Sequence, residues 1–149
     1  MAGAFLAFGD VQAADIISGV PRVVDGDTIE IGSTKIRLES IDAPETDQAC
    51  LDAHGVCWQC GIEARDRLAS YIGNRSIDCA PNGPDRYGRT LAACSIGGED
   101  LNAWMVRQGW ALAFIRYSKK YVADEVTARE TKRGMRSGAF IAPLGLASP

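Results

Sequence analysis

The chain has 149 residues, 46% of them hydrophobic, which suits one folded domain and excludes wholesale disorder. No apolar run approaches the roughly 18 residues that a membrane helix needs, so we expect no membrane association. The net charge of −3 hides an asymmetry, because residues 1–63 carry 11 acids and 3 bases, whereas residues 64–149 carry 8 acids and 13 bases. An acidic pocket could hold a cation while basic surface elsewhere contacts phosphate.

The N-terminal stretch MAGAFLAFGDVQAAD has a short apolar run followed by small residues, like the end of a secretory signal. It lacks a positive n-region, and Asp10 interrupts the apolar run. Residues 1–14 are therefore interpreted as the remnant of a signal peptide or as a disordered tail. We expect the folded domain to span residues 15–140 and residues 141–149 to form a loose tail.

Three strands are predicted first, at residues 16–24, 27–31 and 34–41, because apolar and β-branched residues there are separated by the turn signals DGD and GS. Helical spacing then predicts a helix from Gly61 that stops at Gly73. RSIDCA and RTLAACSI read as two further strands around a turn rich in Pro and Gly.

Two helices are expected after these strands. DLNAWMVRQGW begins with an Asp cap and ends at Gly109, and KKYVADEVTARETKRGM is charged and amphipathic. Five short strands with one inserted helix and helices to follow predict an α+β fold, a five-stranded OB-fold β-barrel packed against helices.

The five cysteines suit an oxidising compartment. Cys79 and Cys94 flank the turn of the predicted hairpin, which would bring them close enough to bond. In the segment CLDAHGVCWQC, a bridge from Cys50 to Cys60 is the preferred pairing and leaves Cys57 unpaired.

A competing interpretation of that segment is a structural zinc site. Its ligands would be Cys50, His54, Cys57 and Cys60, although zinc ligands more often come as two separated pairs.

Carboxylates gather at two places that a strand meander would bring together. Asp25 and Asp27 lie on either side of Gly26, where the backbone is expected to turn tightly, and Asp42 and Glu45 follow in DAPE. Carboxylates converging without histidine or cysteine suit a hard cation with oxygen ligands, calcium or magnesium.

Two arginines accompany these acids, Arg37 at the start of RLESIDAPET and Arg89 at the end of DRYGR. A cation beside two arginines requires an anion between them, and the planar guanidinium matches two phosphate oxygens. Glu39, by contrast, is expected to be a solvated strand residue that faces away from the site.

The blocks VVDGDTIEI, RLESIDAPET, DRYGRTLA and NAWMVRQGWA resemble, in order and spacing, the motifs of the staphylococcal nuclease (thermonuclease) family. The resemblance covers residues 17–137. It implies a five-stranded OB-type barrel with three helices. It also implies calcium-dependent hydrolysis of phosphodiester bonds in DNA and RNA, with unpaired strands preferred and 3′-phosphates as products.

The resemblance also implies a calcium site. Asp27 and Asp42 would supply its carboxylates and Ala43 a backbone carbonyl, while Asp25 would shape the surroundings of the metal. Glu45 would hold or deprotonate the attacking water.

The same resemblance assigns residues to the substrate. Arg37 and Arg89 would clamp the reacting phosphate, Tyr87 and Tyr117 would line the nucleotide pocket, and Arg86 stands where a lysine is common. Ile115 stands where the family has another pocket tyrosine, and the loop after Glu45 is acidic and bears cysteines instead of lysines.

We therefore predict a monomeric, secreted or periplasmic nuclease that uses Ca²⁺. The alternatives are a module of the same fold that binds nucleic acid or protein without cutting, and a redox or zinc protein built on CWQC.

Overall fold

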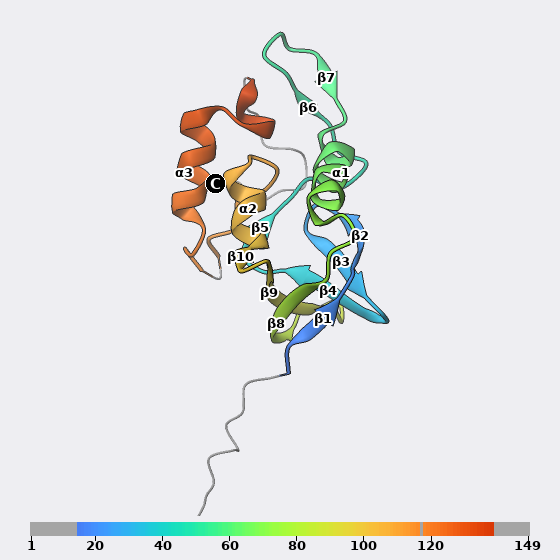
Figure 1. Cartoon of the computed structure of the whole chain (residues 1–149). Helices are drawn as coiled ribbons and strands as arrows, with labels where there is room; N and C mark the ends of the chain where they lie inside the picture. The colour runs from blue at the N-terminus through green and yellow to red at the C-terminus, as the bar shows by residue number, and fades with distance from the viewer. Residues whose placement is uncertain (1–14, 117, 139–149) are drawn as a thin grey trace, which may run out of the picture.

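The computed structural model describes residues 15–116 and 118–138. Strands β1 to β7 precede α1, whereas strands β8 to β11 and helices α2 and α3 follow it (Figure 1). The strands are β1 (Ile17–Gly19), β2 (Arg22–Asp25), β3 (Thr28–Ile31), β4 (Thr34–Leu38), β5 (Ile41–Asp42), β6 (Cys50–Leu51), β7 (Cys57–Trp58), β8 (Ile77–Pro84), β9 (Thr90–Ile96), β10 (Glu99–Asp100) and β11 (Leu112–Ala113). The helices are α1 (Cys60–Ile72), α2 (Leu101–Arg107), α3 (Val122–Thr131) and a short 3₁₀ turn, η2 (Gly134–Ser137).

The main sheet has the strand order β1-β8-β9-β4-β3-β2, with β10 added beside β9. Its two outer strands, β1 and β2, are successive parts of one segment, so that segment joins both edges and the sheet curls toward a barrel. The predicted strand 16–24 is therefore two strands. They separate at Pro21, which has no N–H to donate to a ladder. The mixed sheet and three α-helices confirm the predicted α+β fold of the OB type.

The helices largely follow their predicted boundaries. α1 ends at Ile72 and is followed by Gly73 with a φ of 59°, a conformation that glycine adopts without strain. α2 is capped as expected, because the Asp100 side chain accepts a hydrogen bond from the amide of Ala103 at 3.0 Å. The last predicted helix is shorter than expected, since Lys132 adopts a left-handed conformation after Thr131 and a 3₁₀ turn follows.

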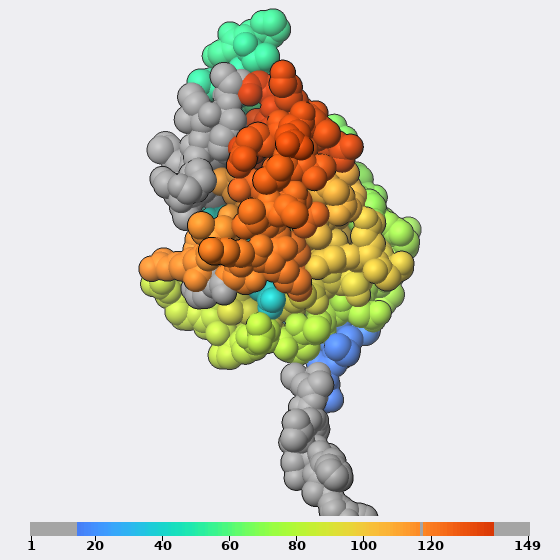
Figure 2. Space-filling model, turned by 90° about the vertical axis from the view of Figure 1, so that its left-hand side faces the viewer, coloured from blue at the N-terminus to red at the C-terminus, as the bar shows by residue number. Residues whose placement is uncertain are grey.

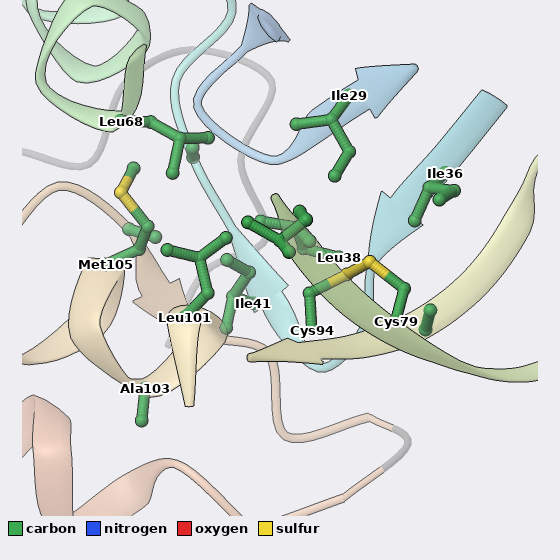
Figure 3. Close-up of a cluster of buried hydrophobic side chains, with 14 of the residues drawn as sticks. Ile29, Ile36, Leu38, Ile41, Leu68, Cys79, Cys94, Leu101, Ala103 and Met105 are labelled. Carbon is green, nitrogen blue, oxygen red and sulfur yellow. A yellow bond between two sulfur atoms is a disulfide. The ribbon is translucent and has the colours of Figure 1, made fainter. Parts of the chain in front are cut away.

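The core lies between the concave face of the sheet and the inner faces of α1 and α2 (Figure 3). Leu68 enters it from α1, Leu101 and Met105 from α2, and Ile29 and Ile36 from the sheet. All five side chains are completely buried. α3 packs on the outside of α2 (Figure 1), so α2 lies between α3 and the sheet.

Both predicted disulfides are present, Cys79–Cys94 across β8 and β9 and Cys50–Cys60 between β6 and α1. The second bond uses two of the four proposed zinc ligands, so the zinc interpretation of CLDAHGVCWQC is wrong. Cys57 is unpaired and exposed on β7. The β6–β7 hairpin projects from the end of the molecule (Figures 1 and 2). None of the described helices is long and apolar enough to span a bilayer.

Candidate functional site

The first acidic pair lies in the tight connection between β2 and β3. Asp25 ends β2, and its carboxylate accepts a hydrogen bond from the amide of Asp27 at 3.1 Å. Gly26 is required for close packing rather than for a left-handed turn, since a Cβ there would lie 2.7 Å from the Cβ of Ala43. The missing side chain lets this connection touch the segment that carries the second acidic pair.

The second acidic pair is brought in by a bend after β4. Ser40 has a φ of 63°, an uncommon conformation for a residue with a Cβ, and its carbonyl accepts from the amide of Phe114 at 2.8 Å. β5 then runs antiparallel to β11, with Asp42 opposite Leu112. The bend turns the chain so that Asp42 and Ala43 reach Asp27, whose carboxylate accepts from the Ala43 amide at 2.8 Å.

Arg37 lies between the two acidic segments. One guanidinium nitrogen donates to the carbonyls of Leu38 and Ile41 at 2.7 and 2.9 Å. The other lies 3.4 Å from the carboxylate of Asp27 and 3.2 Å from that of Asp42. Arg37 therefore offsets the repulsion between the two carboxylates and fixes the bend between β4 and β5.

Asp27 is the carboxylate whose titration departs most from ordinary behaviour. Only 7% of the residue is exposed, and this burial, reinforced by the neighbouring charge of Asp25, raises the pKa of Asp27 to about 7. The charge of Arg37 and the hydrogen bond from the Ala43 amide oppose the rise without cancelling it. An additional positive charge nearby would therefore stabilise the ionised form of the Asp27 carboxyl group.

Glu45 lies on a loop that is held against the start of α1. Its amide donates to the Gln48 side chain at 2.6 Å, and its carbonyl accepts from the Gln48 amide at 2.9 Å. A Cβ at Gly61 would lie 1.7 Å from the Glu45 carbonyl oxygen, so glycine is needed where α1 approaches this loop. The Glu45 side chain is exposed and can reach a water or a ligand.

Arg89 approaches from the turn between β8 and β9. Its Nε donates to Asp85 at 2.7 Å and its Nη1 to the Thr28 hydroxyl at 3.4 Å. Burial opposes ionisation of Asp85, but hydrogen bonds from the backbone of Arg89 and Tyr87 and from the Arg89 guanidinium together lower the pKa of Asp85. Asp85 therefore stays charged over a wide pH range and orients Arg89.

The acids and both arginines line one small pocket of about 150 Å³, which we call the carboxylate pocket. Its walls are Asp25, Asp27, Arg37, Asp42, Ala43, Glu45, Gln48 and Arg89. Every residue predicted for the metal, its surroundings or the chemistry is in this set, although these residues are 64 positions apart along the chain at the extremes.

A larger cavity of about 330 Å³, which we call the side cavity, adjoins the carboxylate pocket because both are lined by Arg37 and Arg89. Arg86 and Tyr87 line the side cavity and not the carboxylate pocket. The ring of Tyr87 is covered by the guanidinium groups of Arg86 and Arg89, at 5.7 and 5.4 Å from the ring centroid. Tyr117, which was predicted beside it, lies outside the described residues.

Three residues near the site differ from the sequence interpretation. Gln48 and Asp85 were not predicted, although each follows a readable pattern, a polar residue three positions after Glu45 and an acid four positions before Arg89. The prediction that Glu39 is a solvated strand residue facing away was wrong. It is half-buried in the bend after β4 and lines the side cavity. Strand alternation explains this, because Glu39 follows Arg37 by two positions and so shares its side of the sheet.

The donors in the carboxylate pocket fit a hard divalent cation. The pocket's acidic side chains, those of Asp25, Asp27, Asp42 and Glu45, offer carboxylate oxygens, and the raised pKa of Asp27 indicates that this carboxylate is short of compensating charge. No cluster of three or more His, Cys, Asp or Glu side chains within residues 15–116 and 118–138 is close enough to hold a metal by itself. A cation here would therefore depend on backbone, water or substrate oxygens as well.

The chain is similar in sequence to known proteins. Residues 35–137 match the family model described as "Staphylococcal nuclease homologue". "Micrococcal nuclease" of Shigella flexneri is 33% identical over 87% of this chain and 76% of its own length. "Thermonuclease" of Staphylococcus hyicus is 32% identical over 80% of this chain and 72% of its own length.

A relative with a different kind of name is "Succinoglycan biosynthesis protein ExoI" of Rhizobium meliloti (strain 1021), 37% identical over 89% of this chain and 71% of its own length. The family model covers more than half of the chain, and the relatives in the preceding paragraph each match at 30% identity or more. The chain belongs to the family of staphylococcal nuclease homologues.

Proposed function

We propose that this protein is a calcium-dependent nuclease that hydrolyses phosphodiester bonds of DNA and RNA and leaves 3′-phosphates. The observation that carries the proposal is the carboxylate pocket, in which oxygen donors, two guanidinium groups and the accessible Glu45 carboxylate surround one small space. A site for binding alone has no use for an exposed carboxylate beside a cation site and a phosphate clamp.

The arginines act on the phosphate. Nucleophilic attack on phosphorus places negative charge on the equatorial oxygens, and guanidinium groups positioned before the reaction stabilise that charge. Arg37 and Arg89 meet this requirement because protein carboxylates and carbonyls already orient both groups. Asp27, Asp42 and the carbonyl of Ala43 would hold the cation, which supplies further positive charge to the phosphate when bound.

Glu45 acts on the water. A carboxylate on the rim of the pocket can orient a water molecule and accept its proton as the oxygen attacks phosphorus. The bond from phosphorus to the 5′ oxygen then breaks, and that oxygen gains a proton, which yields a 3′-phosphate and a 5′-hydroxyl. The Gln48 side chain supports this role because it fixes the backbone of Glu45.

The two disulfides support the proposal that the protein works in an oxidising compartment, as a secreted or periplasmic enzyme. Nucleic acid outside the cytoplasm would then be the substrate. We further propose that unpaired strands are preferred, because a narrow pocket beside a barrel accepts a phosphate more readily from a flexible strand than from a duplex.

The test is digestion of heat-denatured DNA and of RNA by the wild-type protein, Glu45→Gln and Asp47→Asn, with calcium and then with a chelator. Asp47 is the matched control, since it is an exposed acid on the same loop and does not line the carboxylate pocket. We expect calcium-dependent release of acid-soluble product from the wild type and from Asp47→Asn. Glu45→Gln should be slower by about 100-fold or more.

Three outcomes would contradict the proposal. Wild-type protein that binds nucleic acid without cutting it would identify a binding module of the same fold. Cutting that persists in the chelator would remove the cation from the reaction, and equal loss in Glu45→Gln and Asp47→Asn would assign the effect to the loop as a whole.

A further inference from the structure

The side cavity adjoins the two arginines that we propose bind the phosphate, Arg37 and Arg89. It shares both arginines with the carboxylate pocket and is also lined by residues of β5, β8 and β9. Its lining consists of Arg37, Glu39, Ser40, Ile41, Pro84, Asp85, Arg86, Tyr87, Arg89, Leu91 and Phe114. A nucleotide whose phosphate lies between the two arginines therefore has this cavity as the nearest enclosed space for its sugar and base.

The walls of the side cavity suit a flat ring. Ile41, Leu91 and Phe114 are apolar, and Tyr87 lies at the opening with 72% of its surface exposed. Aromatic and apolar side chains bind the faces of nucleobases without distinguishing one base from another. Because such walls do not distinguish the bases, selection among bases must come from a polar group in this cavity.

Figure 2 shows the surface in this region. Cyan atoms from the stretch around β4 and β5 reach the surface between the orange segment before α3 and the yellow-green β8–β9 region.

Glu39 supplies such a polar group. Its backbone is fixed, because its amide donates to the Ala92 carbonyl at 2.9 Å and its carbonyl accepts from the Asn102 side chain at 3.0 Å. One side-chain oxygen, Oε1, is buried and has no hydrogen-bond partner. None of the salt bridges among residues 15–116 and 118–138 involves Glu39. A buried acceptor gains free energy when a donor reaches it, and Glu39 lines the cavity that adjoins the two arginines.

The neighbouring charges do not explain this acid as part of the fold. Arg37 already bonds to Leu38, Ile41, Asp27 and Asp42, and Arg89 bonds to Asp85. Asn102 uses its amide group on the carbonyls of Glu39 and Ala92. Tyr121, whose pKa is raised by burial and also by the charges of Asp100 and Glu39, donates its hydroxyl to Asp100. The carboxylate of Glu39 adds negative charge to a cavity that also holds Arg37, Arg86 and Arg89.

We propose that Glu39 selects guanine for the nucleotide that adjoins the cut; this inference rests on the proposed nuclease function. Guanine carries two adjacent donors on its Watson–Crick edge, a ring N–H and an exocyclic amino group, and a carboxylate offers two adjacent acceptors. Adenine and cytosine present one amino donor beside a ring acceptor. Thymine and uracil present one N–H between two carbonyl oxygens, which repel the carboxylate.

The inference is tested by sequencing the ends produced from a single-stranded oligonucleotide pool of random sequence, under single-hit conditions with calcium. The proteins are the wild type, Glu39→Gln, Glu39→Leu and Glu130→Gln. Glu130 is the matched control, since it is exposed on α3 and is not part of the side cavity. Total cleavage is measured in the same reactions.

We expect wild-type protein and Glu130→Gln to favour guanine over thymine beside the cut by about tenfold, the value of one good pair of base contacts. In Glu39→Gln and Glu39→Leu the preference should fall below about twofold.

The inference is overturned if the wild type cuts without a preference for guanine, or if the preference survives in Glu39→Leu. Preference lost equally in Glu130→Gln would also overturn it. A wild type that cuts nothing in the pool contradicts the nuclease function itself, so the two failures are distinguishable. Thermal unfolding of each variant separates a folding defect from altered selection. If Glu39→Leu unfolds, Glu39→Gln alone decides the outcome.

Discussion

The two arginines of the carboxylate pocket are held by the protein in different ways. Arg37 donates to two backbone carbonyls and contacts two carboxylates, and its side chain is 17% exposed. Arg89 is oriented mainly by Asp85 in its own turn, and its side chain is 27% exposed. Arg37 is therefore part of the fold as well as of the site, whereas Arg89 is carried on a turn that the barrel does not need. The same side chain thus has different consequences for stability at the two positions.

The largest effect is expected for Arg37→Ala. The change removes the guanidinium group that contacts both Asp27 and Asp42, and with it the donor to two carbonyls in the bend after β4. Removing one partner of a buried ion pair costs about 3–5 kcal/mol, so the free energy of unfolding should fall by that amount. Urea denaturation in a chelator measures it. Arg37→Lys is the control that keeps the charge but cannot bridge both carboxylates. Equal stability of all three proteins would contradict this account.

Arg89→Ala should separate activity from stability. The ion pair with Asp85 is partly exposed, so the free energy of unfolding should change by less than about 1 kcal/mol. The rate of phosphodiester cleavage should fall by about 100- to 1000-fold, as when one preorganised donor to a developing charge is lost. Arg133→Ala, an exposed arginine outside both cavities, is the matched control. A stability loss as large as that of Arg37→Ala would remove the distinction between the arginines.

Asp27→Asn should abolish cleavage and raise the free energy of unfolding. The pKa of Asp27 is about 7 in the folded protein and near 3.8 in the unfolded chain. Between these two pH values the folded state therefore holds a proton that the unfolded state has released. Stability of the metal-free wild type is therefore lost between pH 4 and 7 and levels off above that range. Asn removes this loss, so at pH 8 in a chelator the variant should be more stable by about 2–4 kcal/mol while cleavage is abolished.

The control for Asp27→Asn is the pH dependence of the free energy of unfolding of both proteins. The difference in stability between variant and wild type should be small at pH 4 and should grow toward pH 7. Saturating calcium should stabilise the wild type more than the variant. A difference that does not depend on pH would show that the carboxylate is not the cause.

Asp85→Asn tests how Arg89 is oriented. The amide oxygen can still accept from the backbone of Tyr87 and Arg89, so the turn should persist, but the charge beside the guanidinium is lost. We expect cleavage to slow by about tenfold, less than in Arg89→Ala, since the arginine is present but less constrained. The double variant with Arg89→Ala should be no slower than Arg89→Ala alone. Additive losses would give Asp85 a role of its own.

The sequence predicted which residues lie together better than it predicted the path of the chain. Asp27, Asp42, Glu45 and the two arginines were identified because a meander brings strand ends together and because charge of both signs beside one another implies a ligand. The roles of these residues stay predictions, since the structure shows only that they share a pocket.

The bend after β4 was missed for a physical reason. Residues 34–41 have an unbroken strand pattern, and a left-handed serine within them carries no local signal. What supports the bend is remote, the pairing of β5 with β11 and the hydrogen bond from Phe114 to Ser40, about 70 positions later in the chain. The side of the sheet taken by Glu39 was misjudged because a charged residue in a strand was assumed to lie in water.

Ser40→Gly is expected to have the smallest effect and bears on that bend directly. A left-handed conformation costs a residue with a Cβ about 1–2 kcal/mol, and a change to glycine removes this strain. About 0.5–1 kcal/mol of the stabilisation is lost again, because glycine gives the unfolded chain more conformational freedom. The free energy of unfolding should therefore rise by about 0.5–1 kcal/mol, measured by urea denaturation. Ser70→Gly, an exposed position within α1, is the control and should be destabilised. If Ser40→Gly is also destabilised, the strain is offset by contacts of the serine itself, and the bend is held by more than its backbone partners.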